Sequence, residues 1–339
     1  MRRIALPADS EHGGVAVIVA IVMVVMLGFA ALAIDVAKLY AERAQLQNGS
    51  DSAALMLAQK CARNDTINCS ATTPMAADLA NKNAIDGSSN VKSIALDGTN
   101  RTVRVTVGAK ETGASANSVS LFFAGVLGFR SAEVNATSSV RWGSPVKGTT
   151  PFPITVSVCQ VRGQTNVMQL LQLHAKNANA DCNYGPSGAF VQGGFGGLNQ
   201  DSGVCGSAID ISTSKAGGDT GNNPPPYCEG TLNAWAADMT SGKDVIVLLP
   251  VFNAVTGTGT NAVYGLTTLA AFKVQGWKLG SSGLPYTFRN RAPDVPSALE
   301  CREPCRGIIG TFVQYVSLAD GYTLGPVNPD GATIVELTS

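Results

Sequence analysis

The sequence is poor in charged residues and contains almost no histidine. Only 14% of its 339 residues are charged, against about 25% in typical soluble domains. The formal net charge is zero, so no basic field is available to attract nucleic acid, and we expect no nucleic-acid partner. Low charge together with 37 glycines is more typical of an exported, loop-rich β protein than of a cytosolic enzyme.

Motifs that carry catalysis or hold a cofactor are also missing. The sequence contains no H-E-x-x-H, P-loop or dinucleotide fingerprint. Residues 185–188 and 280–283 each miss the nucleophile pattern G-x-S-x-G by one position, and the glycines of 193–197, with no lysine and no following helix, indicate a turn. We therefore expect no cofactor, no small-molecule substrate and no enzymatic activity. An exported hydrolase would have to use His174 as its base, because His12 precedes the apolar stretch described next.

The longest hydrophobic run extends from Gly14 to Ile34 and reads GVAVIVAIVMVVMLGFAALAI, without a charge, an amide or a proline. At about 1.5 Å of rise per residue, a helix of this length spans the ~30 Å hydrocarbon core of a bilayer. Within lipid, only a helix lets a single segment satisfy its own backbone. We predict one transmembrane helix that contacts the lipid bilayer, preceded by a cytoplasmic stub at residues 1–13. Asp35 is expected at the water interface.

A cleaved secretory signal is the main alternative to a retained anchor. Arg2 and Arg3 would form its basic start, and residues 31–33 (Ala-Leu-Ala) resemble a cleavage site. However, the run exceeds the roughly 7–15 residues usual for a signal core. The helical period also continues beyond it, at Val36, Leu39, Tyr40, Leu46, Ala53, Ala54 and Leu57. We favour a retained anchor over a cleaved signal, and both over a buried core helix.

All eight cysteines follow the apolar run: Cys61, Cys69, Cys159, Cys182, Cys205, Cys228, Cys301 and Cys305. An even number on one side of the membrane is typical of disulfides in an oxidising compartment. Roughly a hundred connectivities are possible. Proximity favours the first pair and the last pair, and with less support Cys159–Cys182 and Cys205–Cys228. Without a C-x-x-C motif, zinc is not expected.

The cysteines also set the expected topology, because the basic residues on the two sides of the run give only a slight positive-inside bias. We expect a single-pass membrane protein, with its N-terminus inside and its ectodomain periplasmic or extracellular.

Beyond the run, the pattern predicts an α+β protein with an N-terminal transmembrane helix and a β-rich, disulfide-bonded ectodomain. Residues 35–60 are expected to form a helical stalk, weakened around Gly49. Residues 61–143 are expected to form a small α+β module with a helix at 75–85, a hairpin of 91–96 and 102–107, a helix from Ser118 to Leu127 ended by Gly128, and a strand at 132–142. Residues 143–151 have the composition of a linker. The ectodomain at 144–339 is expected to have strands at 154–161, 245–252, 264–277 and 307–317.

The N-terminal residues also carry a family resemblance. The motifs are the Gly-Gly at 13–14 with the apolar run, AIDV at 33–36, LY at 39–40, QLQN at 45–48 and DSAAL at 51–55. They resemble the start of Tad (tight adherence) Flp pilus-assembly proteins, in particular the TadG-like branch. LFFAGVLG at 121–128, PFPI at 151–154, GFGGL at 194–198, LPVF at 249–252, AAF at 270–272 and CRGIIGTFV at 305–313 extend the resemblance.

The resemblance implies a non-enzymatic component of a pilus-assembly or secretion apparatus, with other assembly proteins or pilin subunits as partners. Pilin-type members carry a glutamate five residues after the cleavage glycine. Ile18 and Val19 occupy the corresponding places here, which favours an uncleaved anchor. Phe122 and Phe123 of the LFFAGVLG motif are expected in the core.

One further motif supports a different class of function. Asp210, Ser212 and Ser214 match D-x-S-x-S, the metal-dependent adhesion pattern of von Willebrand A domains, and their oxygens suit Mg²⁺. The preceding residues 203–209 do not form the long apolar strand that this pattern requires. A surface adhesin or envelope binding protein with a divalent-metal site is therefore the alternative hypothesis.

Overall fold

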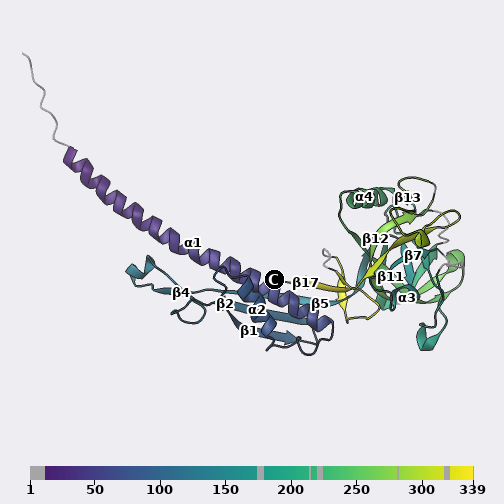
Figure 1. The fold of residues 1–339 in the computed structure, drawn as a ribbon, viewed down its shortest axis with the longest axis horizontal. Coiled ribbons are helices and arrows are strands. Elements are labelled where there is room, and N and C mark those ends of the chain that lie inside the picture. Colours follow the sequence, from purple (N-terminus) through teal and green to yellow (C-terminus); the bar gives the residue numbers. More distant parts are fainter. Residues whose placement is uncertain are drawn as a thin grey trace, which may run out of the picture. The chain divides into compact units, whose positions relative to one another are not determined.

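The computed structural model describes residues 12–173, 179–213, 215–219, 224–280, 282–316 and 321–338 (Figure 1). The chain divides into two compact units. Unit 1 comprises residues 1–141 and 337–339, and unit 2 comprises residues 142–336. Both combine helices with sheets, and together with the long N-terminal helix and four disulfides they confirm the predicted α+β class.

Unit 1 is a small sheet packed against helices. Its elements are α1 (His12–Ala62), α2 (Pro74–Lys82), β1 (Ser89–Asp97), β2 (Thr102–Ala109), β3 (Ser118–Ser120), the 3₁₀ turn η1 (Ala124–Leu127), β4 (Ser131–Glu133) and the first half of β5 (Asn135–Thr150). The predicted hairpin is confirmed, since β1 and β2 pair antiparallel from Ser89 with Ala109 to Asp97 with Thr102. The first half of β5 pairs antiparallel with β2.

Helix α1 changes character along its length. Every side chain from residue 14 to residue 30 is exposed, although nearly all are apolar. From Leu46 onward one face is buried, with Ala53, Ala54 and Leu57 fully enclosed. This face packs on α2 and β2 (Figure 1). The expectation of a projecting stalk at 35–60 is therefore wrong for its second half, because its apolar stripe serves as the core of unit 1.

Gly49 does not break α1 but allows α2 to approach it. A Cβ atom at this position would lie 3.2 Å from the Cα and 3.3 Å from the carbonyl oxygen of Ala80. Such contacts are tighter than ordinary packing, and the neighbour is backbone that cannot rotate away. A residue that is unfavourable in an isolated helix is thus favoured here by tertiary contact.

Replacement of Gly49 by leucine is expected to destabilise unit 1 by about 1–3 kcal/mol, the usual range for overpacking a core. The matched control is Gly230→Leu in the helix of unit 2, where a Cβ meets nothing within 4 Å. Thermal unfolding in detergent checks both variants. Equal unfolding temperatures for the two would contradict the packing argument.

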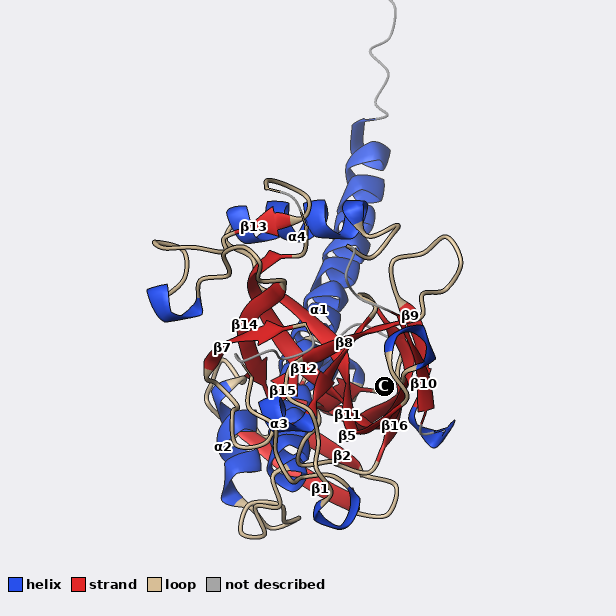
Figure 2. Cartoon of the chain, turned by 90° about the vertical axis from the view of Figure 1, so that its right-hand side faces the viewer, coloured by secondary structure: helices blue, strands red, loops and turns tan. Residues whose placement is uncertain are grey.

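Unit 2 contains the remaining elements: the second half of β5, β6 (Ile154–Ser157), α3 (Val158–Val161), β7 (Met168–Gln172), η2 (Pro186–Gly188), β8 (Phe195–Leu198), β9 (Ser207–Asp210), η3 (Ile211–Thr213), β10 (Lys215–Asp219), α4 (Glu229–Thr240), β11 (Val245–Thr256), η4 (Gly259–Asn261), β12 (Val263–Lys278), β13 (Thr287–Phe288), η5 (Ser297–Leu299), β14 (Gly307–Val313), β15 (Tyr315–Val316), β16 (Thr323–Gly325) and β17 (Thr333–Leu337). Its main sheet has the order β10-β8-β6-β11-β12-β14-β7. The strands are drawn in red in Figure 2. Strand β6 runs parallel to β11, and the other neighbours pair antiparallel.

The core of unit 2 forms between this sheet and α4. The strand predicted at 245–252 is confirmed. Val247, Leu249 and Val251 of β11 are buried, as are Leu248 and Phe252 on the opposite face, so the strand is covered on both sides. Trp235 of α4 meets the ring of Phe152 at 5.4 Å and that of Trp277 at 6.1 Å. Aromatic rings from the helix and from the sheet therefore belong to one continuous hydrophobic cluster.

The expected linker at 143–151 is instead the second half of β5, which pairs with β9 and β16. The glycine at the start of this half of β5 allows a neighbouring strand to approach closely and does not make the chain flexible. A Cβ atom on Gly143 would lie 2.3 Å from the carbonyl oxygen of Gly325 on β16. The segment at 143–151 has the composition of a linker because its glycine lets the backbone of the neighbouring strand β16 come close.

All eight cysteines are paired, as Cys61–Cys69, Cys159–Cys182, Cys205–Cys228 and Cys301–Cys305. These pairs coincide with those that proximity in the sequence favours. The first closes the loop between α1 and α2, and the other three lie within unit 2. No disulfide joins the two units.

We expect no thiol to react with an alkylating reagent in the native, unreduced protein, because the structure leaves none of the eight cysteines free. Mass spectrometry after alkylation tests this, and reduction in denaturant should then expose eight reactive thiols. Two or more modified cysteines before reduction would contradict the pairing.

Candidate functional site

Asp35 ends the apolar run of α1 and binds a segment far along the chain. Its carboxylate accepts hydrogen bonds from the backbone N–H groups of Phe122 at 3.1 Å, Phe123 at 2.9 Å and Ala124 at 2.6 Å. Only 4% of the residue is exposed. The expectation that water solvates Asp35 is therefore wrong, because three amides occupy the positions that water would take. Hydrogen bonds to an ionised acceptor are roughly twice as strong as neutral ones.

A second set of contacts holds the same segment at its base. Glu111 accepts hydrogen bonds from the Ser120 backbone N–H at 2.6 Å and from its hydroxyl at 2.9 Å. Lys38 of α1 pairs with Glu111 at 3.3 Å and donates to the Ser120 carbonyl oxygen at 3.1 Å. The backbone hydrogen bond from Ser120 holds the pKa of the Glu111 carboxyl below its usual range. This carboxylate is therefore ionised at neutral pH, and the segment is held to α1 at two points.

The segment itself, residues 121–129 (LFFAGVLGF), is here called the apolar loop. The predicted helix over 118–127 is wrong: β3 occupies 118–120, and only Ala124–Leu127 form a 3₁₀ turn, which Gly128 ends in a left-handed conformation. The amides that a longer helix would use internally are taken by Asp35. Phe122 is 82% exposed rather than in the core as expected, while Phe123 is partly buried.

The apolar loop and the end of the apolar run line an open hollow of about 380 Å³. All of its lining residues are apolar or glycine: Val25, Gly28, Phe29, Ala31, Leu32, Phe123, Val126 and Leu127. The loop therefore lies alongside α1 over the stretch from Val25 to Asp35. Sequence reasoning missed this arrangement. The sequence contains one indication of it, because the loop has nine consecutive residues without a polar side chain.

The residues of the adhesion-type motif have other partners in unit 2. Asp210 accepts hydrogen bonds from the Ser212 backbone N–H at 3.0 Å and hydroxyl at 2.5 Å, and pairs with Lys147 at 3.1 Å. The hydrogen bond from the Ser212 hydroxyl contributes most to lowering the pKa of Asp210. Ser214 lies outside the described residues. Within the described ranges, no three His, Cys, Asp or Glu side chains gather as metal ligands.

Two further candidates from the sequence are His174 and the glycine-rich residues 193–197. His174, the base of the hydrolase hypothesis, lies outside the described residues. Of the glycine-rich 193–197, three residues belong to β8 rather than to the expected turn. The Gly193 and Gly194 amides donate to Asp181 at 2.8 Å and Gln160 at 2.7 Å, so both already have acceptors within the protein.

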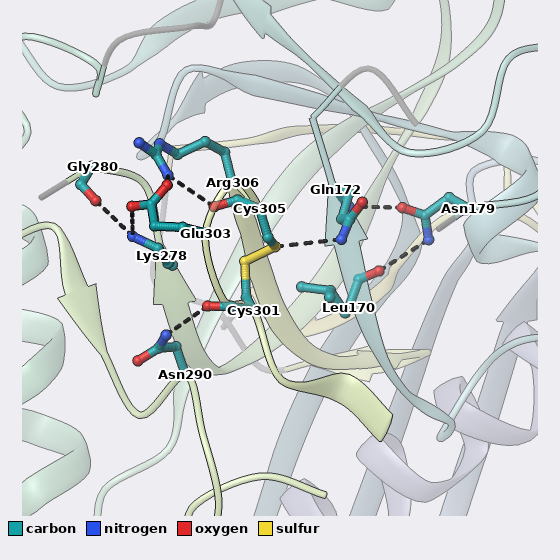
Figure 3. The surroundings of a disulfide bond; sticks show 10 residues. All are labelled: Leu170, Gln172, Asn179, Lys278, Gly280, Asn290, Cys301, Glu303, Cys305 and Arg306. Atoms are coloured by element: carbon teal, nitrogen blue, oxygen red, sulfur yellow. Dashed lines mark hydrogen bonds and ion pairs between the residues drawn. A yellow bond between two sulfur atoms is a disulfide. The ribbon is translucent and has the colours of Figure 1, made fainter. Parts of the chain in front are cut away.

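Charged groups surround the Cys301–Cys305 disulfide (Figure 3). Buried Lys278 pairs with Glu303 at 2.7 Å and donates to the Gly280 carbonyl oxygen at 3.0 Å. The hydrogen bond from Lys278 contributes most to lowering the pKa of Glu303. A buried ammonium requires such partners, so this cluster fixes the disulfide-closed turn to β12.

An exposed apolar helix that continues into disulfide-bonded units indicates a membrane-anchored protein with an extracytoplasmic region. The structure describes one helix that is long and apolar enough to cross a bilayer, and its apolar window is wholly unburied. Disulfides persist in oxidising compartments outside the cytoplasm.

Residues 13–59 match the model of Tad, the family of Flp pilus-assembly TadE/G-like proteins. This N-terminal segment is therefore a TadE/G-like domain, which confirms the resemblance over residues 13–59. The domain coincides with α1 almost end to end and includes Asp35 and Lys38. Neither the curated proteins nor the solved structures include a match to the chain.

Proposed function

We propose that the protein is a membrane-anchored, non-enzymatic component of a bacterial Tad/Flp-type pilus-assembly or secretion apparatus. The observation that carries this proposal is the TadE/G-like domain at residues 13–59, which coincides with an exposed apolar helix. Disulfide-bonded units follow it in the same chain.

In the proposed topology, α1 crosses the cytoplasmic membrane once, with its N-terminus inside and the chain after the apolar run, including unit 2, outside. The exposed apolar side chains from residue 14 to residue 30 then face lipid. The buried half of α1 ties the anchor rigidly to unit 1, because its side chains form part of that core. Unit 2 is the part available for pilin subunits or other assembly proteins.

The test is genetic complementation in the source bacterium, with surface pili counted by electron microscopy. Deletion of the gene should abolish pili, and the wild-type chain should restore them. Asp210→Ala should restore them equally well, since this proposal assigns no metal to that residue. Normal piliation after deletion, together with lost divalent-metal-dependent adhesion, would instead favour the adhesin hypothesis.

The mature protein is expected to retain residues 14–34, because the pilin glutamate is missing and the helix continues unbroken to Ala62. Mass spectrometry of the protein purified from membranes checks this through peptides that span Ala33 and Ile34. A mature chain that begins at Ile34 would show that the run is a cleaved signal.

A further inference from the structure

The apolar loop exposes a cluster of large apolar side chains outside the apolar run. Its exposed fractions are 82% for Phe122, 88% for Val126, 64% for Leu127 and 67% for Phe129. Exposure of two phenylalanines and two branched aliphatic side chains to water at one tip is unfavourable. Exposed apolar groups that lie together mark a surface that something covers.

The position of the loop identifies what covers it. The loop lies alongside α1 from Val25 to Asp35, and all but the last residue of this stretch belong to the apolar run that spans the bilayer in the proposed topology. Ten residues of helix correspond to about 15 Å, which is half of a ~30 Å hydrocarbon core. When α1 spans the bilayer, the apolar loop is therefore at the depth of one leaflet.

The backbone of the loop is largely satisfied within the protein. Non-helical backbone at membrane depth is tolerated where protein buries it, because an unsatisfied polar group in hydrocarbon costs several kcal/mol and therefore needs a partner within the protein. Seven amides of the loop have such acceptors, three of them on Asp35: those of Leu121, Phe122, Phe123, Ala124, Val126, Gly128 and Phe129. A carboxylate at the end of a transmembrane run would be costly in lipid without partners, and these amides supply them.

The charges are arranged for the same environment. No charged or polar side chain occurs between Leu121 and Phe129. The ionic groups gather at the base of the loop, where Lys38 pairs with Glu111 and where exposed Arg130 accepts the Leu121 amide through its carbonyl oxygen. A basic side chain at this level is suited to lipid headgroup phosphates, as at the ends of other membrane segments.

We propose that the apolar loop inserts into the outer leaflet of the membrane beside α1, with lipid acyl chains around its exposed side chains. Unit 1 is then held to the bilayer at two places, so its orientation about α1 is fixed as well as its distance from the membrane. Asp35 is the positioning residue that holds the loop against the helix. This inference goes beyond the proposed function and rests on α1 spanning the membrane.

Three tryptophan variants of the full chain test the insertion. Val126→Trp probes the loop, Val24→Trp probes the apolar run, and Ile85→Trp is the matched control. All three positions are highly exposed, at 88%, 70% and 89%, so a larger side chain fits without repacking. The Ile85 amide binds the side chain of Gln45, which lies about 15 Å beyond Asp35 along α1 and thus outside the bilayer.

Each variant is reconstituted in vesicles of phosphatidylcholine and phosphatidylglycerol, with or without brominated acyl chains, and iodide serves as the aqueous quencher. The three native tryptophans are buried, and wild type gives their background. Brominated lipid should quench most of the added emission in Val126→Trp and Val24→Trp. Iodide alone should quench it in Ile85→Trp.

The contrary outcomes separate this inference from the proposed anchor. If Val24→Trp is quenched by lipid while Val126→Trp behaves like Ile85→Trp, the insertion is overturned and the anchor stands. If Val126→Trp is shielded from both quenchers, protein covers the loop, and the insertion is again overturned. If brominated lipid quenches none of the three, α1 does not span the bilayer, and the proposed function fails together with the insertion. Unchanged thermal unfolding of each variant confirms that it is folded.

Discussion

Asp35→Ala should release the apolar loop and destabilise unit 1 by about 3–5 kcal/mol, since each buried donor left without an acceptor costs about 1–3 kcal/mol. The substitution leaves three backbone amides without their acceptor in a site from which water is largely excluded. Hydrogen exchange is the direct measurement. Peptides covering 120–129 should exchange faster by about two orders of magnitude or more, since each 1.4 kcal/mol corresponds to about tenfold.

Two controls make this result specific. Asp35→Asn keeps one carbonyl oxygen and nearly the same shape, so its loss should be smaller. Asp97→Ala removes a carboxylate that also accepts backbone amides, from Thr99 and Asn100, but in an exposed turn. It should leave exchange at 120–129 unchanged. Wild-type exchange in Asp35→Ala would mean that the carboxylate does not hold the loop.

Met23→Arg should prevent stable insertion of α1. Met23 lies near the middle of the apolar run, is 57% exposed, and has no acidic side chain near it on the helix. A central arginine costs about 2.5–3.5 kcal/mol on insertion scales, enough to shift a lone helix out of the bilayer. The readouts are membrane fractionation and a reporter fused to the C-terminus that is active only outside the cytoplasm.

Met23→Leu is the matched control, because it changes the shape of the side chain without adding charge, and it should be exported like wild type. If Met23→Arg is exported and retained in the membrane as well as Met23→Leu, residues 14–34 are not the anchor. The proposed function would then lose its physical basis, and so would the insertion of the apolar loop.

Several features of the protein follow from local sequence patterns. The apolar run of α1, the β1–β2 hairpin and strand β11 are each confirmed, because each depends on a period or composition within one short segment. The disulfide pairs coincide with neighbours in sequence, because closing a short loop loses the least chain entropy.

Other features depend on partners that are far away in the sequence. Gly49 predicts a weakened helix, and Gly143 lies in a segment whose composition predicts a linker. In the structure, each of these glycines instead allows the backbone of another segment to approach. The sequence of the apolar loop fits a buried helix. In the structure, however, its amides donate hydrogen bonds to the Asp35 carboxylate, and Phe122 is exposed. The sequence alone determined which segments are apolar enough to leave water, because hydrophobicity belongs to each side chain. Only the tertiary structure decided which of them packs in a core and which faces outward, because that choice depends on where the backbone hydrogen bonds of each segment find their partners.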